Sequence, residues 1–250
     1  MGCALAAAKP FASYFSQPAV GQAAVVFYQG FLLQQFVRQT SPTQPLRVYI
    51  EGDGRPWLGR GRVAADPTPT TPVALQLALA DPHPNVLYLA RPCQFGARPL
   101  DPHCTDNTWW TDRRYDPTLL PVFAAAIAAA RQPGQPLELV GYSGGAVFAA
   151  ALAADLPNVT QFATVAGNLA VAGFNQYHQV PALPHALDPI TFANRLTTIP
   201  QTHWVGAADT IVPAHFAQQF VAAQGHPTTA VVKILPGVTH TTGWLDSLPQ

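Results

Sequence analysis

Short apolar runs alternate with longer alanine-rich or amphipathic segments along most of the chain. Runs of about 4–8 apolar residues between Gly, Pro or polar clusters indicate strands, and longer runs with helical spacing indicate helices. The predicted strands are 23–28, 31–37, 46–51, 86–90, 137–141, 160–166, 202–206 and 230–235. The predicted helices are 73–80, 117–131, 146–154, 213–223 and a short one within 240–248.

The order of these elements predicts a mostly parallel central sheet. Gln29-Gly30 separates the first two strands, which favours a β-hairpin near the N-terminus. Strands then alternate with helices, as in parallel sheets with helices on both faces. We predict one α/β domain over 1–250, with 1–20 as an N-terminal extension. The segment 168–200 is longer than an ordinary connection between two strands, so we interpret it as a small lid insertion over a pocket.

The composition argues against two classes of partner. Of the 250 residues, 48% are hydrophobic and only 10% are charged, and the formal net charge is zero. Binding to nucleic acid requires clustered Lys and Arg that neutralise phosphates, so we expect no nucleic-acid partner. The same balance argues against electrostatic attachment to a membrane. The best apolar run, 119–130, is too short for a transmembrane helix and contains Pro121.

The three cysteines bear on redox state and location. Cys93 and Cys104 either form a disulfide, which suits an oxidising compartment, or remain buried thiols. No Cys-x-x-Cys pair is present in the sequence, and we expect no metal or other cofactor. Gly2-Cys3 is similar to the lipidation point of bacterial lipoprotein signals. Cys3 is therefore either a lipid tether left by a trimmed signal, in the bacterial cell envelope or periplasm, or an ordinary residue of a cytoplasmic protein.

The strongest chemical signal is the pentapeptide Gly141-Tyr142-Ser143-Gly144-Gly145. It has the form Gly-x-Ser-x-Gly and stands between a predicted strand and a predicted helix. This context is typical of a nucleophile elbow, a sharp turn that projects the serine hydroxyl above the sheet. The helix N-terminus also favours developing negative charge. A chance glycine-rich turn is the alternative, and we predict that Ser143 is a nucleophile.

A serine nucleophile needs a general base and an acid that orients this base. Asp209 follows the predicted strand 202–206, at the edge where sites of parallel sheets collect. A helix-capping role is its alternative, and Asp188 is the competing acid. His240 follows the last predicted strand, and a surface histidine is its alternative. We predict a catalytic triad of Ser143, Asp209 and His240, in the chain order expected after such an elbow.

Backbone N–H groups are expected to stabilise the oxyanion. One donor should be Gly144, the residue after the nucleophile, and the other should come from the loop after the third strand. That loop is Glu51-Gly52-Asp53-Gly54, whose glycines allow a tight turn. We choose the N–H of Asp53, with Gly54 as the second choice. A plain loop and a cation site are the alternatives, although Glu51 and Asp53 are only one carboxylate pair and a metal takes more ligands.

Further side chains are candidates for the substrate pocket. Asn168 follows a strand and either hydrogen-bonds within the site or caps the next helix. Four aromatic residues either line a pocket or belong to the core: Trp57, Trp109, Trp110 and Tyr142. Three arginines either bind a substrate carboxylate or form structural ion pairs: Arg91, Arg113 and Arg114.

These motifs, in this order, resemble bacterial α/β-hydrolases. The resemblance is carried by the elbow at 141–145, by 206–209 with Val212-Pro213, and by Pro236-Gly237 with His240. The segments 49–54, 88–93 and 165–168 are similar to those of a poorly characterised bacterial group often described as lipoproteins. The resemblance covers the chain from about Leu46 onward. It implies the α/β-hydrolase fold, the triad and a hydrolase activity, without a particular substrate.

The sequence therefore predicts a serine hydrolase that cleaves carboxylic esters or related acyl bonds through an acyl-enzyme. The low charge and apolar composition favour a small-molecule substrate with an uncharged, apolar acyl group. A peptidase, thioesterase or lipase with the same triad is one alternative, because the pocket decides between them. A non-catalytic binding protein that keeps the fold is the other. The sequence leaves the oligomeric state open.

Overall fold

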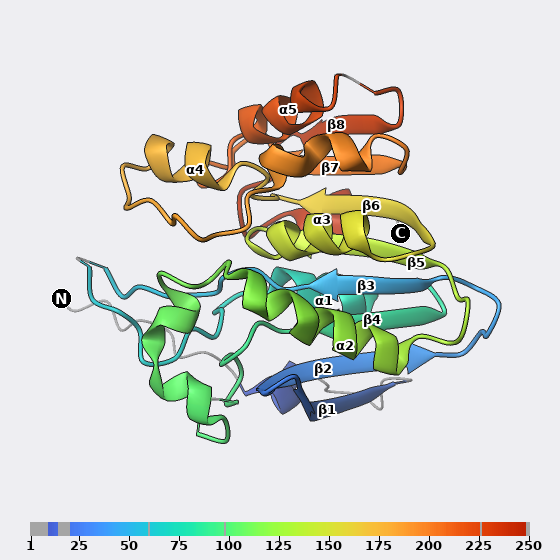
Figure 1. Ribbon diagram of the computed structural model, residues 1–250, viewed down its shortest axis with the longest axis vertical. Coiled ribbons are helices and arrows are strands. Elements are labelled where there is room, and N and C mark those ends of the chain that lie inside the picture. Colours follow the sequence, from blue (N-terminus) through green and yellow to red (C-terminus); the bar gives the residue numbers. More distant parts are fainter. Residues whose placement is uncertain (1–9, 15–20, 60, 98, 226, 249–250) are drawn as a thin grey trace.

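An eight-stranded sheet forms the centre of the molecule (Figure 1). The computed structural model describes residues 10–14, 21–59, 61–97, 99–225 and 227–248, and Cys3 lies outside these ranges. The spatial order of the strands is β1-β2-β4-β3-β5-β6-β7-β8. The strands are β1 (Gln22–Tyr28), β2 (Phe31–Gln39), β3 (Leu46–Ile50), β4 (Asn85–Leu89), β5 (Leu137–Tyr142), β6 (Val159–Val165), β7 (Gln201–Gly206) and β8 (Ala230–Leu235).

The strand directions confirm a mostly parallel sheet with an N-terminal hairpin. β1 and β2 pair antiparallel, with Tyr28 opposite Phe31. Gln29 and Gly30 form the turn with positive φ angles of 46° and 93°, a conformation that tight hairpin turns require. β2 pairs antiparallel with β4, and the neighbours from β4 through β3 to β8 pair parallel.

Helices cover both faces of the sheet, as the alternating pattern predicts. In Figure 1, α2 (Leu120–Ala130) and α3 (Gly145–Asp155) lie in front of the strands, and α1 (Val73–Ala80) lies behind them. α5 (Ala214–Ala223) packs against β7 and β8, and the short α6 (Trp244–Ser247) packs against α1. Parallel strands need this double cover, because both of their faces are apolar.

The strands in the middle of the sheet divide their side chains between two cores. In β4, Leu87 and Leu89 join the core beside α2 and α3, whereas Val86 and Tyr88 join the core beside α1. Successive side chains of a strand point to opposite faces, so a continuous apolar run fills both cores. All five residues of β4 are buried. The sheet is therefore a rigid platform whose carboxyl-terminal edge can position a site.

The structure departs from the predicted elements in its short helical segments. The helix predicted at 117–131 is a 3-10 turn, η4 (Pro117–Leu119), followed by α2. The candidate lid 168–200 contains α4 (Val171–Tyr177), which is the helix after Asn168, and an unpredicted 3-10 segment, η5 (Pro189–Leu196). Other 3-10 turns are η1 (Phe11–Tyr14), η2 (Pro102–Thr105) and η3 (Asn107–Trp110). None of the described helices has the length and apolarity that crossing a bilayer would require.

Candidate active site

Ser143 occupies a sharp turn between β5 and α3. Its φ angle is +49°, a left-handed conformation that is unusual for a residue other than glycine. Two backbone hydrogen bonds hold it there: its N–H donates to the C=O of Val165, and its C=O accepts from the N–H of Asn168, both at 3.0 Å. A Cβ atom at Gly145 would lie 2.2 Å from the C=O oxygen of Ile50, so only glycine lets α3 start so close to β3. The turn has the geometry of the predicted elbow.

The imidazole of His240 lies between Ser143 and Asp209. Its Nε2 is 3.0 Å from the hydroxyl oxygen of Ser143, and its Nδ1 is 2.8 Å from Oδ2 of Asp209. The side chain of Asp209 is fully buried, and its Oδ1 accepts the N–H groups of Ile211 and Val212. Because the carboxylate accepts, Nδ1 carries the proton and Nε2 is free to accept the proton of Ser143. The three predicted triad residues thus come together from the ends of three strands.

Two aromatic side chains hold the backbone of His240. The hydroxyl of Tyr142 and the indole N–H of Trp244 both donate to the C=O of His240, at 3.0 and 2.9 Å. Tyr142 both lines the cavity and belongs to the core beside α1. Trp244 was not singled out in the sequence. The position of Trp244, four residues after His240, could have identified it from the sequence.

The competing acid, Asp188, has a different role. Its carboxylate accepts the N–H groups of Val171 and Ala172, at 2.8 and 2.9 Å, at the start of α4. A carboxylate in this position satisfies backbone donors that a helix leaves unpaired. The helix-capping role considered for Asn168 thus belongs to Asp188.

A buried carboxylate braces the loop after β3. Glu51 accepts the N–H groups of Gly52 and Leu75, at 2.9 and 3.2 Å, and the hydroxyl of Tyr88. Burial raises the pKa of Glu51 to about 7, although these three donors favour its charged form. Gly54 has a φ of +72°, and a Cβ atom there would lie 2.0 Å from the C=O oxygen of Pro67. Hydrogen bonds to Glu51 therefore fix the start of this loop. At its end, only glycine can occupy position 54.

The carboxylate of Asp53 is held by groups far away in the sequence. Nη1 of the buried Arg91 lies 3.0 Å from Oδ1 of Asp53, and the Tyr115 hydroxyl donates to Oδ2. The guanidinium of Arg91 also lies over the ring of Phe148, 4.5 Å from its centroid. Of the two alternatives for Arg91, the structure has the buried ion pair. Burial lowers its pKa, and Asp53 opposes this effect.

Asp53 also packs against the elbow. A Cβ atom at Gly144 would lie 2.0 Å from Oδ1 of Asp53, so the two residues are in close contact. Within the described part of the chain, the N–H groups of Asp53 and Gly144 donate to no protein acceptor. The same part contains no group of three or more His, Cys, Asp or Glu side chains placed to hold a metal ion.

A cavity of about 930 Å³ opens above Ser143. Candidate residues in its wall are Asp53, Gly54, Trp57, Arg114, Tyr142, Ser143, Asn168 and His240. Trp109 and Trp110 belong to the core instead: the indole N–H of Trp110 donates to the C=O of Ala64, and the guanidinium of Arg113 lies over the ring of Trp109. For these two tryptophans, the core alternative holds.

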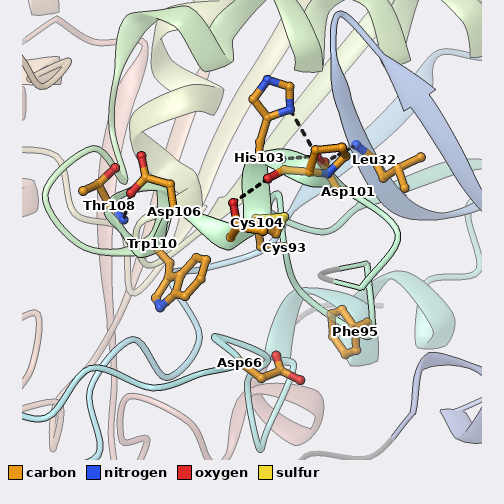
Figure 2. The surroundings of a disulfide bond; sticks show 12 residues. Leu32, Asp66, Cys93, Phe95, Asp101, His103, Cys104, Asp106, Thr108 and Trp110 are labelled. Carbon is orange, nitrogen blue, oxygen red and sulfur yellow. Dashed lines mark hydrogen bonds and ion pairs between the residues drawn. A yellow bond between two sulfur atoms is a disulfide. The ribbon is translucent and has the colours of Figure 1, made fainter.

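A disulfide joins Cys93 and Cys104, whose sulfur atoms are 1.98 Å apart (Figure 2). Inside the loop that it closes, the carboxylate of Asp101 accepts the N–H of Leu32 at 2.8 Å, which ties the loop to β2. Arg91 stands two residues before Cys93. The cross-link therefore braces the segment from which Arg91 reaches Asp53.

Comparison with known proteins identifies a family. The model of the family described as Serine hydrolase (FSH1) matches residues 101–234, more than half of the chain, including Ser143 and Asp209. No curated protein matches the sequence.

Several solved structures have a similar fold. An α/β serine hydrolase without a lid from Xanthomonas campestris is 16% identical, with a TM-score of 0.55, over 90% of this chain and 88% of that one. The Pyrococcus furiosus esterase Pf2001 is 12% identical, with a TM-score of 0.58, over 86% and 83%. A puromycin-hydrolysing peptidase from Mycobacterium tuberculosis is 14% identical, with a TM-score of 0.59, over 89% of this chain. The chain spans only 37% of that peptidase.

These similarities are low in sequence and extensive in structure, so they establish the fold and not the substrate. The chain has the α/β-hydrolase fold and belongs to the FSH1 serine hydrolase family.

Proposed function

We propose that this serine hydrolase cleaves carboxylic esters through an acyl-enzyme formed on Ser143. The observation that supports this most is the position of the His240 ring, within hydrogen-bonding distance of both the Ser143 hydroxyl and the Asp209 carboxylate. A base between nucleophile and acid in this order is the arrangement that serine acyl transfer requires.

In the first half of the reaction, Oγ of Ser143 attacks the ester carbonyl carbon and Nε2 of His240 accepts the hydroxyl proton. The carbonyl π electrons move to its oxygen. When the tetrahedral intermediate collapses, the bond to the alcohol breaks and His240 returns the proton to the alcohol oxygen. Asp209 keeps the proton on Nδ1 and stabilises the imidazolium between these two transfers.

The negative charge on the carbonyl oxygen needs donors that are already in place. We assign this role to the N–H groups of Gly144 and Asp53, whose loops contact each other and which donate to no protein acceptor in the described part of the chain. Such donors typically contribute about 2.7–4 kcal/mol each to transition-state stabilisation. In the second half of the reaction, water takes the place of the alcohol, and His240 activates it by the same proton transfers.

The test combines covalent labelling with hydrolysis. We expect a fluorophosphonate probe to form an adduct that peptide mass spectrometry locates on Ser143, and short and long p-nitrophenyl esters to be hydrolysed. Ser143→Ala should abolish labelling. Ser143→Ala and His240→Ala should each lower kcat by about 10⁶-fold, because the two residues act as a unit. Circular dichroism of both variants serves as the control for folding.

Other outcomes would point to other functions. Faster turnover of matched anilides or thioesters than of esters would indicate a peptidase or a thioesterase on the same triad. Absence of both adduct and turnover in a folded sample would contradict the proposal and favour a binding protein with this fold.

A further inference from the structure

One side chain beside the nucleophile has unused hydrogen-bonding capacity. Asn168 is only 2% exposed, and in the described part of the chain neither its amide nitrogen nor its amide oxygen has a protein partner. It lines the same cavity as Ser143 and His240. Its backbone N–H donates to the C=O of Ser143 at 3.0 Å, so its position is tied to that of the nucleophile.

The structural role that would explain Asn168 is performed by another residue. Asp188, not Asn168, accepts the first N–H groups of α4. Buried polar groups are nearly always paired, because an unpaired donor or acceptor costs free energy. An unpaired donor and an unpaired acceptor on one buried side chain at the cavity wall therefore point to a ligand that pairs with both.

The charges around this wall favour a neutral ligand group. Arg114 lines the cavity together with Asp53 and Asp112. Arg91 forms an ion pair with Asp53, and Nε of Arg114 lies 3.5 Å from the same carboxylate. The formal charges of these two arginines and two aspartates sum to zero. A substrate carboxylate would therefore compete with the carboxylate of Asp53 for the guanidinium of Arg114.

Much of the remaining wall is apolar. It includes the side chains of Trp57, Phe174, Val180, Leu183, Ile211 and Val212. Phe174, Val180 and Leu183 come from the segment 168–200, which starts with Asn168. The cavity thus combines a largely apolar wall with the unpaired amide of Asn168 near the nucleophile.

We propose that Asn168 is a specificity-determining residue and that the substrate carries a neutral group with both a donor and an acceptor on an otherwise apolar body. A carboxamide fits best, because its adjacent N–H and C=O can pair with Oδ1 and Nδ2 of Asn168, and a hydroxyl is the smaller member of this class. This inference rests on the proposed function, since the substrate must enter this cavity to reach Ser143.

Substrates of equal shape test the inference. On the acyl side, the substrates are ethyl succinamate, ethyl 4-methylpentanoate and monoethyl succinate. They carry a carboxamide, an apolar isostere and a carboxylate, respectively. On the alcohol side, the acetates of 3-hydroxypropanamide, 3-methylbutanol and 3-hydroxypropanoate carry the same three groups in the same order. Ser143→Ala gives the background rate. In one of the two series, we expect kcat/KM for the carboxamide to exceed that of the apolar isostere by about 10- to 100-fold.

Asn168→Leu, of similar size, should remove this preference, whereas Asn194→Leu, on an exposed residue of η5, should keep it. The inference is overturned if the apolar isostere or the carboxylate is preferred in both series, or if Asn168→Leu keeps the wild-type ratio. Labelling of Ser143 with turnover but no such preference would reject the inference and leave the proposed function standing. Lack of labelling and turnover would reject the proposed function.

Thermal unfolding gives a readout that does not depend on turnover. Replacing an unpaired buried amide with an apolar side chain should raise Tm by about 2–4 °C in a chain of this size. A lower Tm for Asn168→Leu would mean that Asn168 has a structural role, and this result would also overturn the inference.

Discussion

At the scale of single residues, the site combines strain with firm support. Ser143 has a φ of +49°, a conformation that typically costs about 1–3 kcal/mol and persists only where neighbours enforce it. Here the enforcement comes from hydrogen bonds to Val165 and Asn168 on the adjacent strand and loop. Asp209 is supported similarly, because two backbone N–H groups fix one oxygen while the other faces His240. Both residues are therefore held in place by backbone hydrogen bonds.

The placement of Asp209 leads to a prediction for Asp209→Asn. If the amide oxygen keeps the N–H groups of Ile211 and Val212, the amide nitrogen faces Nδ1 of His240 and donates to it. Nε2 then carries the proton and cannot accept one from Ser143, so we expect kcat for ester hydrolysis to fall by about 10⁴-fold with the fold intact. Asp188→Asn, at the α4 cap, is the control. A tenfold or smaller loss in Asp209→Asn would contradict the assignment of the acid.

At the scale of elements, the site depends on how closely α3 approaches the sheet. Residues 145–153 of this alanine-rich helix are all buried, and its first residue touches the backbone of β3. Small side chains allow this approach, and the approach brings the N-terminus of α3 to the carboxyl ends of β3 and β5. The loop after β3, which contains Asp53, and the elbow after β5 become neighbours because β3 and β5 are paired.

A methyl group at this contact should disrupt it. In Gly145→Ala, the new Cβ atom meets the backbone of Ile50 and Glu51, which cannot move without distorting β3. We expect a loss of about 1–3 kcal/mol in the free energy of unfolding, measured by urea denaturation, together with a lower kcat.

The matched control is Gly173→Ala in α4, where the nearest heavy atom would be 3.6 Å from the new Cβ atom. Alanine favours helix over glycine, so this variant should gain about 0.5–1 kcal/mol. Equal stability of the two variants would show that the close approach at Gly145 is unimportant.

At the scale of the whole molecule, two fully buried titratable side chains make the free energy of unfolding depend on pH. His203 is fully buried in β7, where it contacts the Thr164 hydroxyl and the rings of Phe162 and Phe220. Burial lowers its pKa to about 3. Glu51, also fully buried, has its pKa raised to about 7. The folded state therefore disfavours the charged form of both groups.

These shifts predict the pH dependence of unfolding. Below its ordinary pKa of 6.5, His203 takes up a proton in the unfolded chain but stays neutral in the folded one, so stability falls as pH decreases from 6.5 towards 3. Glu51 acts in the opposite sense, because stability falls as pH rises from about 4.5 to 7. His203→Gln removes only the first effect. Its free energy of unfolding should fall less steeply with acid than that of the wild type, by roughly 4 kcal/mol over the range.

Urea denaturation between pH 3 and 8 measures this difference. His185→Gln, at an exposed histidine, is the control and should follow the wild type. If His203→Gln and the wild type have parallel pH profiles, His203 is protonated in the folded state and the reasoning from burial is wrong.

The amino-acid sequence by itself determined the eight strands, the mostly parallel sheet, the elbow and the order of Ser143, Asp209 and His240. These features follow from local chain geometry: short apolar runs between turn residues form strands, and Gly-x-Ser-x-Gly between a strand and a helix is typical of the elbow. The structure placed the three residues together as the order predicts. Their catalytic role stays a proposal until labelling and mutation test it.

Only the tertiary structure decided the partners of each side chain. Arg91 and Tyr115 meet Asp53 across 38 and 62 residues, and Tyr142 reaches His240 across 98. The sequence also did not decide that β4 lies between β2 and β3 or that Trp109 and Trp110 belong to the core. Nor did it show that the amide of Asn168 is unpaired. Such contacts depend on which strands become neighbours and how tightly helices pack on them, because these distances are set by the assembled sheet and not by spacing along the chain.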